Sequence, residues 1–449
     1  MRGGPSGLGA PPAHGQTVAV SASPNPLTSR LFRQGLVRLV LAANAYRPRF
    51  RNRALTIPSF FAGWLVSEAA PLVLATWALG SRRAVRASRT DGGRLGPADR
   101  VGLGLSAVAA VGLAGLVREG VLAGEQLDGA LATVVPAEDL AAAPHALRAG
   151  AVLPVLMGNR RRRITRNISY ATADGHRLRL DVYTPLHDPL PGERRPAVLQ
   201  IHGGGWVIGS KDQQGIPLLN HLASCGWVGF NIDYRLSPKV KYPEHLVDCK
   251  RALAWIREHA EEYSVDPDFV VVTGGSAGGH LCALVALTQD DPRFQPGFES
   301  ADTSVQAAVP FYGVYDMLDR GGDHNHVFRD FLERMVMGVP PDEHEELWRN
   351  YSPVDHVGPD APPMFVIHGD RDVLVPVEGA RRFVEHLRAV SRSTVVYAEL
   401  QGAQHAFEVF PSARSVRAVE AVERFLHHVH DEYLDARADR GVPVPVAGA

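Results

Sequence analysis

Lysine and cysteine are both scarce in this chain, and neither sign of charge dominates it. Only four of the 449 residues are lysine, while arginine is abundant, a bias that does not by itself indicate a function. The formal net charge of -1 argues against a general nucleic-acid-binding protein. The three cysteines, Cys225, Cys249 and Cys282, are an odd number without the spacing of a metal site. We therefore expect buried free thiols and no disulfide framework.

The chain also lacks a recognisable signal peptide, because its basic N-terminus is not followed promptly by an apolar core. Its length exceeds that of one ordinary domain and predicts a large domain with an appendage. Residues 1–25 are rich in Gly, Pro, Ser and Ala and are expected to form a disordered tail. Residues 436–449 are expected to form a second, flexible tail.

Residues 26–157 are predicted to be a helical N-terminal region, beginning with a basic amphipathic helix over 31–46. Its apolar segments 59–80 and 101–117 are each long enough to be a candidate membrane segment, and arginines flank both. Glu68 lies near the middle of the first segment and would cost about 2.5 kcal/mol or more on insertion. The region is therefore either a two-helix membrane hairpin, with the side on which the rest of the chain lies undecided, or a soluble appendage of a cytoplasmic protein.

From residue 158 to residue 435 the pattern changes to alternating strands and helices. The basic segment 158–166 could contact anionic lipid headgroups or be a solvated linker. Alternating or apolar runs predict strands at 168–170, 178–183, 197–201, 228–232, 269–273, 307–311, 364–367 and 394–399. Helical patterns lie between and after them, at 246–262, 277–287, 377–390 and 415–433. This alternation predicts an α/β domain whose mostly parallel sheet is covered by helices on both faces.

Ser276 lies in the most informative motif of the chain, GGSAGG at 274–279, directly after the β-branched run 270–273. A strand that enters Gly-x-Ser-x-Gly and leaves as a helix is the pattern of a nucleophile elbow. Such a turn holds the serine in a strained backbone conformation, and the glycines on both sides let strand and helix pack closely. The amide of Ala277, at the helix N-terminus, can then stabilise an anion.

A second glycine motif, HGGGW at 202–206, directly follows a predicted strand. Three consecutive glycines cost backbone entropy and usually serve a close approach of the backbone to another group. Here that group would be a substrate oxyanion, held by the amides of Gly203 and Gly204 together with that of Ala277. The alternative is a plain glycine-rich turn.

A serine nucleophile needs a base to accept its proton and a carboxylate to orient that base. Two carboxylates, Asp370 and Asp372, follow the predicted strand at 364–367. Asp372 is favoured because the loop continues directly into VLVP, while Asp370 suits turn hydrogen bonds. His405 comes next, between the last predicted strand and the last helix, which is the position of the base in hydrolase chain order.

Together these motifs resemble the α/β-hydrolase fold and, within it, the hormone-sensitive-lipase-like carboxylesterases that carry an HGGG motif. The resemblance covers residues 164–433 and includes DYRLSP at 233–238 and VDPD at 265–268. The segment 174–183 also resembles prenylcysteine methylesterases and feruloyl-esterase-like enzymes. With its apolar N-terminal region, the whole chain is similar to the membrane-associated lipases and esterases of mycobacteria and other actinobacteria.

The resemblance implies a role for each motif residue. Ser276 would be the nucleophile, Asp372 the acid and His405 the base, with the HGGG glycines as the oxyanion hole. Many members of the family have an aspartate directly before the nucleophile, where this chain has Gly275. That departure affects the bracing of the loop or the contacts with substrate and leaves the triad intact.

We therefore expect a serine carboxylic-ester hydrolase that acts on a small-molecule or lipid ester and needs no metal or organic cofactor. Residues 316–348 are expected to form a cap over its pocket. An amidase, a carbamate hydrolase or a prenylcysteine-methylesterase-like enzyme would use the same triad and stays an alternative. A non-catalytic binding module on a hydrolase fold is a different class. Such modules typically lose a triad member, and all three candidates are present here.

Overall fold

The computed structural model describes residues 27, 29–48, 55–90, 95–141 and 162–442. The expected tail at 1–25 and the start of the basic segment, 158–161, lie outside the described residues. The rest of that segment begins the first strand of the sheet, so residues 162–166 are not a free linker. The last helix continues to Asp439, past the point at which the flexible tail was expected to begin.

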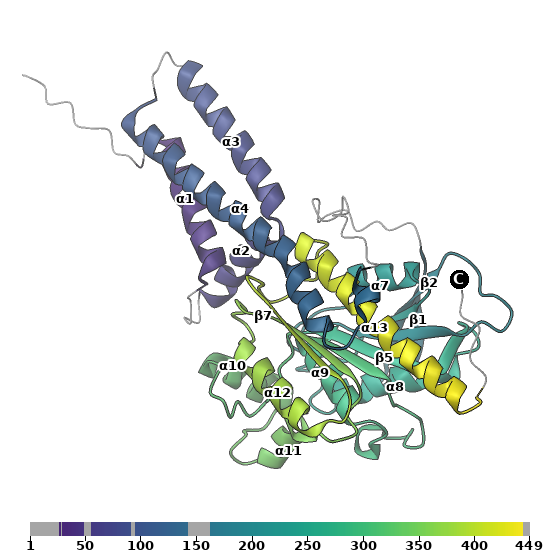
Figure 1. Ribbon diagram of the computed structural model, residues 1–449. Helices are drawn as coiled ribbons and strands as arrows, with labels where there is room; N and C mark the ends of the chain where they lie inside the picture. Colours follow the sequence, from purple (N-terminus) through teal and green to yellow (C-terminus); the bar gives the residue numbers. More distant parts are fainter. Residues whose placement is uncertain (1–26, 28, 49–54, 91–94, 142–161, 443–449) are drawn as a thin grey trace, which may run out of the picture.

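An eight-stranded sheet forms the centre of the molecule (Figure 1). Its spatial order is β1-β2-β4-β3-β5-β6-β7-β8. The β1–β2 and β2–β4 pairs are antiparallel and all the others are parallel, which confirms the predicted mostly parallel sheet. The strands are β1 (Arg162–Ala173), β2 (His176–Pro185), β3 (Arg195–Ile201), β4 (Val228–Ile232), β5 (Val265–Gly275), β6 (Ala307–Phe311), β7 (Met364–Gly369) and β8 (Val395–Leu400).

Helices cover both faces of this sheet, because the central strands are apolar on both sides. One face carries α8 (Glu244–Glu258), α9 (Ala277–Leu287) and α12 (Val377–Val390). The other carries α7 (Ile216–Ser224) and α13 (Ala413–Asp439). Shorter helices lie in the connections between the later strands: η2 (Pro292–Phe294), α10 (His326–Phe331), the π-helical η3 (Leu332–Met337), α11 (Glu345–Asn350) and η4 (Pro353–His356).

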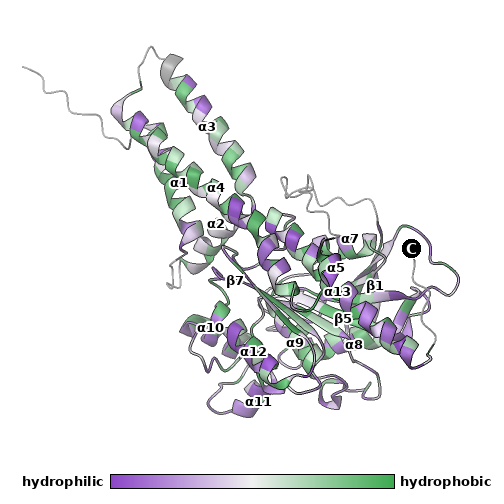
Figure 2. Ribbon diagram, viewed as in Figure 1, coloured by the Kyte–Doolittle hydropathy of each residue, from purple (hydrophilic) through white to green (hydrophobic). Residues whose placement is uncertain are grey.

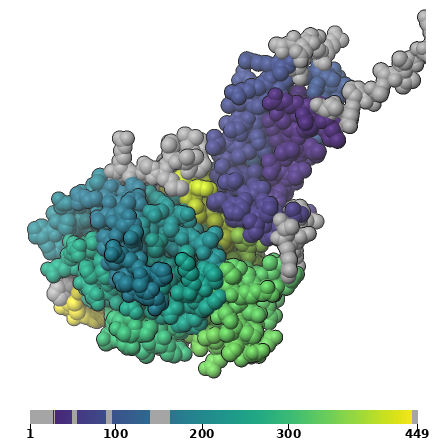
Figure 3. Space-filling view, turned by 180° about the vertical axis from the view of Figure 1, so that it is seen from behind, coloured from purple at the N-terminus to yellow at the C-terminus, as the bar shows by residue number. Residues whose placement is uncertain are grey.

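Four N-terminal helices form a bundle that projects from the body, the domain built around the sheet (Figures 1 and 3). They are α1 (Arg30–Tyr46), α2 (Thr56–Glu68), α3 (Ala70–Thr90) and α4 (Pro97–Leu131). The short α5 (Ala137–Ala141) packs on the body, where Leu140 contacts the core shared by α7 and α13. Glycines let α1 and α4 approach closely, since a Cβ on Gly102 would lie 2.3 Å from the carbonyl carbon of Leu31. The far end of α4 belongs to the body, where Ala123, Leu127 and Leu131 join the same core as α7 and α13.

The two candidate membrane segments fold differently from each other. Residues 101–117 lie inside α4, which is long and apolar enough to cross a membrane and has only 22% of its most apolar window buried. Residues 59–80 do not form one straight helix, because the chain bends by 90° between α2 and α3. The pair meets the same criteria only if the bent helices are counted as one span.

Glu68 explains the position of this bend. Its side chain is 2% exposed and forms an ion pair with Arg414 of α13, which is 1% exposed. The hydroxyl of Ser412 donates a second hydrogen bond to the Glu68 carboxylate at 2.7 Å. A buried carboxylate is tolerated when it is paired and hydrogen-bonded in this way. Glu68, whose charge disfavours membrane insertion, thus attaches the bundle to the body through Arg414.

Replacing Glu68 by alanine would leave the Arg414 guanidinium buried without its carboxylate. Removing one partner of a buried ion pair costs about 3–5 kcal/mol. We expect Glu68→Ala to lower the free energy of unfolding by about 3 kcal/mol in a urea titration followed by tryptophan fluorescence. The control is Asp360→Ala, which breaks the exposed Arg392–Asp360 pair and should change stability by less than about 1 kcal/mol. Equal effects of the two substitutions would contradict this role of Glu68.

Candidate active site

Ser276 lies at the sharp turn between β5 and α9. Its φ of 59° and ψ of -122° are a strained conformation for a residue with a side chain, as the elbow motif predicts. The surroundings leave no space for larger neighbours. A Cβ on Gly274 would lie 2.5 Å from the Gly278 carbonyl oxygen, and one on Gly278 would lie 2.1 Å from that of Ile201. Glycines are therefore required on both sides of the serine, and the hydroxyl projects from the end of the sheet.

The structure brings the three predicted triad residues together. His405 Nε2 lies 2.8 Å from Ser276 Oγ, and His405 Nδ1 lies 2.6 Å from Asp372 Oδ2. All three side chains come from the carboxyl ends of parallel strands or the loops that follow them. Loops after β7 and β8 thus supply the acid and the imidazole, while β5 supplies the hydroxyl. The distances are those of a continuous hydrogen-bonded chain.

Asp372 is fixed on both of its oxygens. Oδ1 accepts the amides of Leu374 and Val375 at 2.9 and 2.8 Å, and Oδ2 faces His405, with His368 Nε2 at 3.4 Å. Burial alone would raise the pKa of the Asp372 carboxyl. The positive charge of His405 and the hydrogen bonds from both histidines outweigh this effect and hold the pKa below its usual range. Asp372 is therefore ionised at neutral pH.

The competing carboxylate has a different task. Asp370 Oδ1 accepts the amide of Gly402 at 2.7 Å and so ties the loop after β7 to the loop after β8. It is not hydrogen-bonded to His405. This is the turn-bracing role that the sequence suggested for Asp370, and the geometry separates the two aspartates clearly.

The expected oxyanion donors are only partly available. The amide of Gly203 donates to Gln214 Oε1 at 2.7 Å, so in this structure that donor already has an acceptor within the protein. Within the described part of the chain, the amides of Gly204 and Gly205 have no protein acceptor, and Gly205 lines the cavity beside Ser276. The amide of Ala277 lies in the first turn of α9, where no intrahelical acceptor exists. The sequence did not single out Gly205 as a candidate donor, because nothing in a run of three glycines shows which amide faces the serine.

The N-terminal helices contact the very loops that carry the acid and the imidazole. Trp64 of α2 donates its indole N–H to the carbonyl of Ala406 at 2.8 Å, directly after His405. Glu119 of α4 pairs with Arg371, directly before Asp372, at 2.9 Å. No sequence motif marks these residues, and their partners are more than 250 positions away in the chain. The bundle is thus part of the frame of the site.

An apolar cavity of about 320 Å³ opens beside Ser276 and His405. Its lining includes Ile57 of α2, the α10 residues Val327, Phe328 and Phe331, and Leu374 and Val375 of the loop after β7. The α10 residues lie within the segment 316–348 that was expected to be a cap. The cavity therefore combines the body, that segment and the N-terminal bundle.

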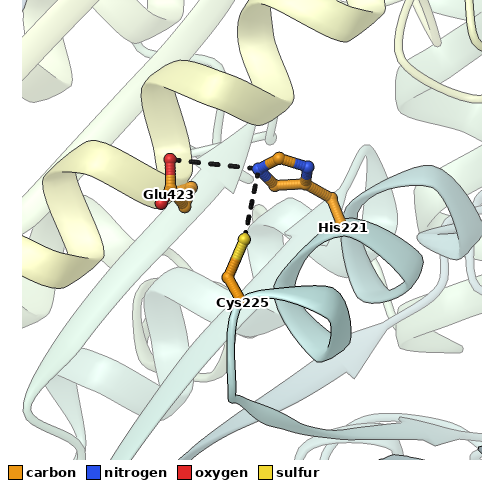
Figure 4. Close-up of side chains that lie close together, drawn as sticks. All are labelled: His221, Cys225 and Glu423. Carbon is orange, nitrogen blue, oxygen red and sulfur yellow. Dashed lines mark hydrogen bonds and ion pairs between the residues drawn. The ribbon is translucent and has the colours of Figure 1, made fainter. Parts of the chain in front are cut away.

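Among the described residues, His221, Cys225 and Glu423 are side chains of the types that bind metal ions and lie close together (Figure 4). His221 Nε2 lies 3.8 Å from Cys225 Sγ and 3.9 Å from Glu423 Oε2. Burial by itself would lower the pKa of His221. The hydrogen bonds with Cys225 and Glu423 outweigh this effect, and the pKa is raised to about 9. The His221 imidazole therefore pairs with the Glu423 carboxylate, and Cys225 Sγ lies beside it. All three cysteines are free, and Cys249 and Cys282 are buried while Cys225 is partly exposed.

The sheet order, the elbow and the Ser–His–Asp geometry define an α/β hydrolase. Residues 180–387 match the BD-FAE family. The chain is 44% identical over 398 residues to a protein described as a probable carboxylic ester hydrolase, LipM, covering 86% of this chain and 90% of the relative. It is 43% identical to esterase LipQ over 287 residues, 64% of this chain and 68% of the relative. Both relatives come from Mycobacterium tuberculosis.

A solved structure agrees with these relatives. The esterase Est2 of Thermogutta terrifontis with bound butyrate is 29% identical and matches with a TM-score of 0.50, covering 65% of this chain and 97% of that one. The chain belongs to the α/β-hydrolase esterases related to mycobacterial LipM and LipQ, and it is a carboxylic ester hydrolase.

The contrast between the two aspartates can be tested directly. We expect Asp372→Asn to lower kcat about 10⁴-fold, because the imidazole loses the acceptor that fixes its tautomer. Asp370→Asn keeps an oxygen for the Gly402 amide and should stay within about tenfold of the parent enzyme. The measurement is steady-state hydrolysis of a p-nitrophenyl ester. A larger loss in the Asp370 variant than in the Asp372 variant would reverse the assignment of the acid.

Proposed function

We propose that this esterase works through Ser276 as nucleophile, His405 as general base and acid, and Asp372 as the group that orients the imidazole. The observation that carries the proposal is the continuous chain of hydrogen bonds from Asp372 through His405 to a hydroxyl at a strained elbow. A hydroxyl alone is a weak nucleophile and needs an adjacent base. The low pKa of Asp372 supplies a fixed negative charge for that base.

In the first half-reaction, Ser276 Oγ attacks the ester carbonyl while His405 Nε2 accepts the hydroxyl proton. The C–O π bond breaks, and its electron pair resides on the carbonyl oxygen of a tetrahedral intermediate. Asp372 stabilises the imidazolium that forms. When the intermediate collapses, the bond to the alcohol breaks and His405 returns the proton to the departing alcohol oxygen. The product of this half-reaction is an acyl ester of Ser276.

The backbone amides of Gly204, Gly205 and Ala277 are the donors proposed for the oxyanion. Each such donor contributes about 3–4 kcal/mol to the stability of the transition state in other hydrolases. Gly203 has a supporting role in this scheme. A Cβ at that position would lie 3.0 Å from the Cβ of Ser276, so its lack of a side chain allows the two loops to approach.

In the second half-reaction, water replaces the alcohol. His405 Nε2 accepts a proton from the water molecule as its oxygen attacks the acyl carbon, and the same amides hold the second oxyanion. Collapse breaks the bond to Ser276 Oγ, which recovers its proton from His405. The free acid leaves, and the enzyme is restored without any other reactant.

The apolar cavity supports an aliphatic or aromatic acyl group as the part of the substrate that binds beside Ser276. A volume of about 320 Å³ lies at the small end of ligand sites, which favours short and medium acyl chains. Phe328 and Phe331 of α10 would act as the cap in this arrangement. Ile57 of α2 makes the N-terminal bundle a part of the acyl site.

The test of the nucleophile uses p-nitrophenyl esters from acetate to palmitate. We expect Ser276→Ala to lower kcat by about 10⁴-fold or more for every ester, because the acyl-enzyme cannot form. A fluorophosphonate probe should label the parent enzyme and not the variant. The exposed Ser300, replaced by alanine, is the matched control and should keep full turnover and labelling. Undiminished hydrolysis by Ser276→Ala would refute the proposal.

We also propose that the N-terminal bundle associates with a lipid membrane. Most of the large hydrophobic side chains exposed on the described surface lie on its helices, and the bundle is coloured as largely hydrophobic (Figure 2). Exposed apolar side chains that gather on one part of a protein surface are typical of an interaction site. Examples from α1, α2 and α4 are Leu36, Val40, Phe61, Leu65, Val108 and Val111.

Carbonate extraction of cell membranes tests this association. The parent protein should stay in the membrane pellet. Replacing both Val108 and Val111 by lysine should move it to the supernatant, because a charge at a bilayer core costs about 2.5–3.5 kcal/mol per residue. Leu186→Lys alters an equally apolar exposed side chain on the hydrolase body and should stay in the pellet. Recovery of the parent protein in the supernatant would contradict membrane association.

A further inference from the structure

Gly275 leaves an unusual space directly beside the nucleophile. The sequence has no side chain there, although many related enzymes have an aspartate. In this structure the space is filled from two other parts of the chain. A Cβ on Gly275 would lie 2.7 Å from the hydroxyl of Tyr312 and 3.0 Å from Oε1 of Glu408. A carboxylate is therefore present beside the elbow, but it comes from the loop that carries His405.

Glu408 and Tyr312 are hydrogen-bonded to each other. The hydroxyl of Tyr312 donates to the Glu408 carboxylate, and both side chains are buried. The ring of Tyr312 then packs on the imidazole of His405, with 4.5 Å between their centroids. Tyr312 has a φ of 36°, a conformation that few residues with side chains adopt, so its surroundings must hold it in place. Its amide donates to the carbonyl of Ile367 at 2.9 Å, and its hydroxyl is held by Glu408.

Groups from several elements that surround Glu408 influence the pKa of its carboxyl. Burial raises the pKa of Glu408 to about 7, and Glu68 of α2 adds to this effect although Arg414 neutralises that residue. The hydrogen bond from Tyr312, a backbone hydrogen bond at Glu408 and the electrostatic interaction with His405 act in the opposite direction. Two of the groups that stabilise the carboxylate, Tyr312 and His405, therefore lie in the active site.

We propose that Glu408 is a positioning residue for His405: its carboxylate occupies the space beside Gly275 and holds Tyr312 against the imidazole. This inference rests on the catalytic roles proposed above for Ser276 and His405. Glu408 touches neither the substrate nor the reacting atoms. Its effect passes through the Tyr312 ring to the orientation of the base.

A transfer of the carboxylate from one loop to the other tests the proposal. Glu408→Ala should lower kcat about 10- to 100-fold with KM changed by less than about threefold, because the base is displaced while the acyl cavity is intact. Gly275→Asp in the parent enzyme should also lower kcat, since it forces a second carboxylate against Glu408. In the Glu408→Ala background the same Gly275→Asp should lower kcat by a smaller factor than in the parent enzyme, because the new side chain then meets only Tyr312 and no second carboxylate.

The conservative variant Glu408→Gln keeps an acceptor for Tyr312 and should retain kcat within about fivefold of the parent. The matched control is Glu420→Ala on α13, which removes another buried glutamate away from the elbow and should leave kcat unchanged. The proposal is overturned if Gly275→Asp is equally harmful in both backgrounds, or if Glu408→Gln loses as much kcat as Glu408→Ala.

Fluorophosphonate labelling separates this outcome from a failure of the catalytic assignment. If the parent enzyme is labelled at Ser276 and the Glu408 variants do not behave as stated, only the role of Glu408 is refuted. If the parent enzyme is not labelled, the catalytic roles fail and the role of Glu408 fails with them. Circular dichroism melting of each variant identifies any that do not fold. For the single variants, Glu408→Gln against Glu408→Ala then decides the question.

Discussion

The whole site depends on one strained residue. Ser276 holds a backbone conformation that costs on the order of 1–3 kcal/mol, and it does so because the strands and glycines around it leave no other path. β5 must end beside β3 and β6 in parallel register for Gly274 and Gly278 to approach Ile201. Once this turn is fixed, the Ser276 hydroxyl can project only from the carboxyl end of the sheet. The loops after β7 and β8 then need only bring a carboxylate and an imidazole next to that hydroxyl.

The loops after β7 and β8 are held by contacts with each other and by contacts with the N-terminal helices. Asp370 links them to each other through Gly402, while the N-terminal helices hold each of them separately through Arg371 and Ala406. Glu68 anchors the same helices to α13, a few residues beyond His405. The bundle is therefore an integral part of the catalytic frame, although its composition suggests only an anchor or an appendage.

Much of this could be predicted from the sequence, because local patterns set it. Apolar runs gave the strands, and the chemistry of GGSAGG, together with chain order, selected Ser276 and His405. What could not be predicted depends on contacts between distant segments. The segment 59–80 bends by 90° directly after Glu68, whose partner Arg414 lies far away in the chain. Gln214 accepts the Gly203 amide, a contact that no periodicity reveals.

α4 has a mechanical consequence. It is one unbroken helix of 35 residues, about 52 Å long, and its two halves lie in different cores. Leu113 and Leu116 pack inside the bundle, while Leu127 and Leu131 pack beneath the central sheet. If the bundle enters a membrane as proposed, a continuous helix packed in both cores would fix the distance between the membrane and the mouth of the acyl cavity. That distance, besides the pocket volume, would then limit which esters reach Ser276.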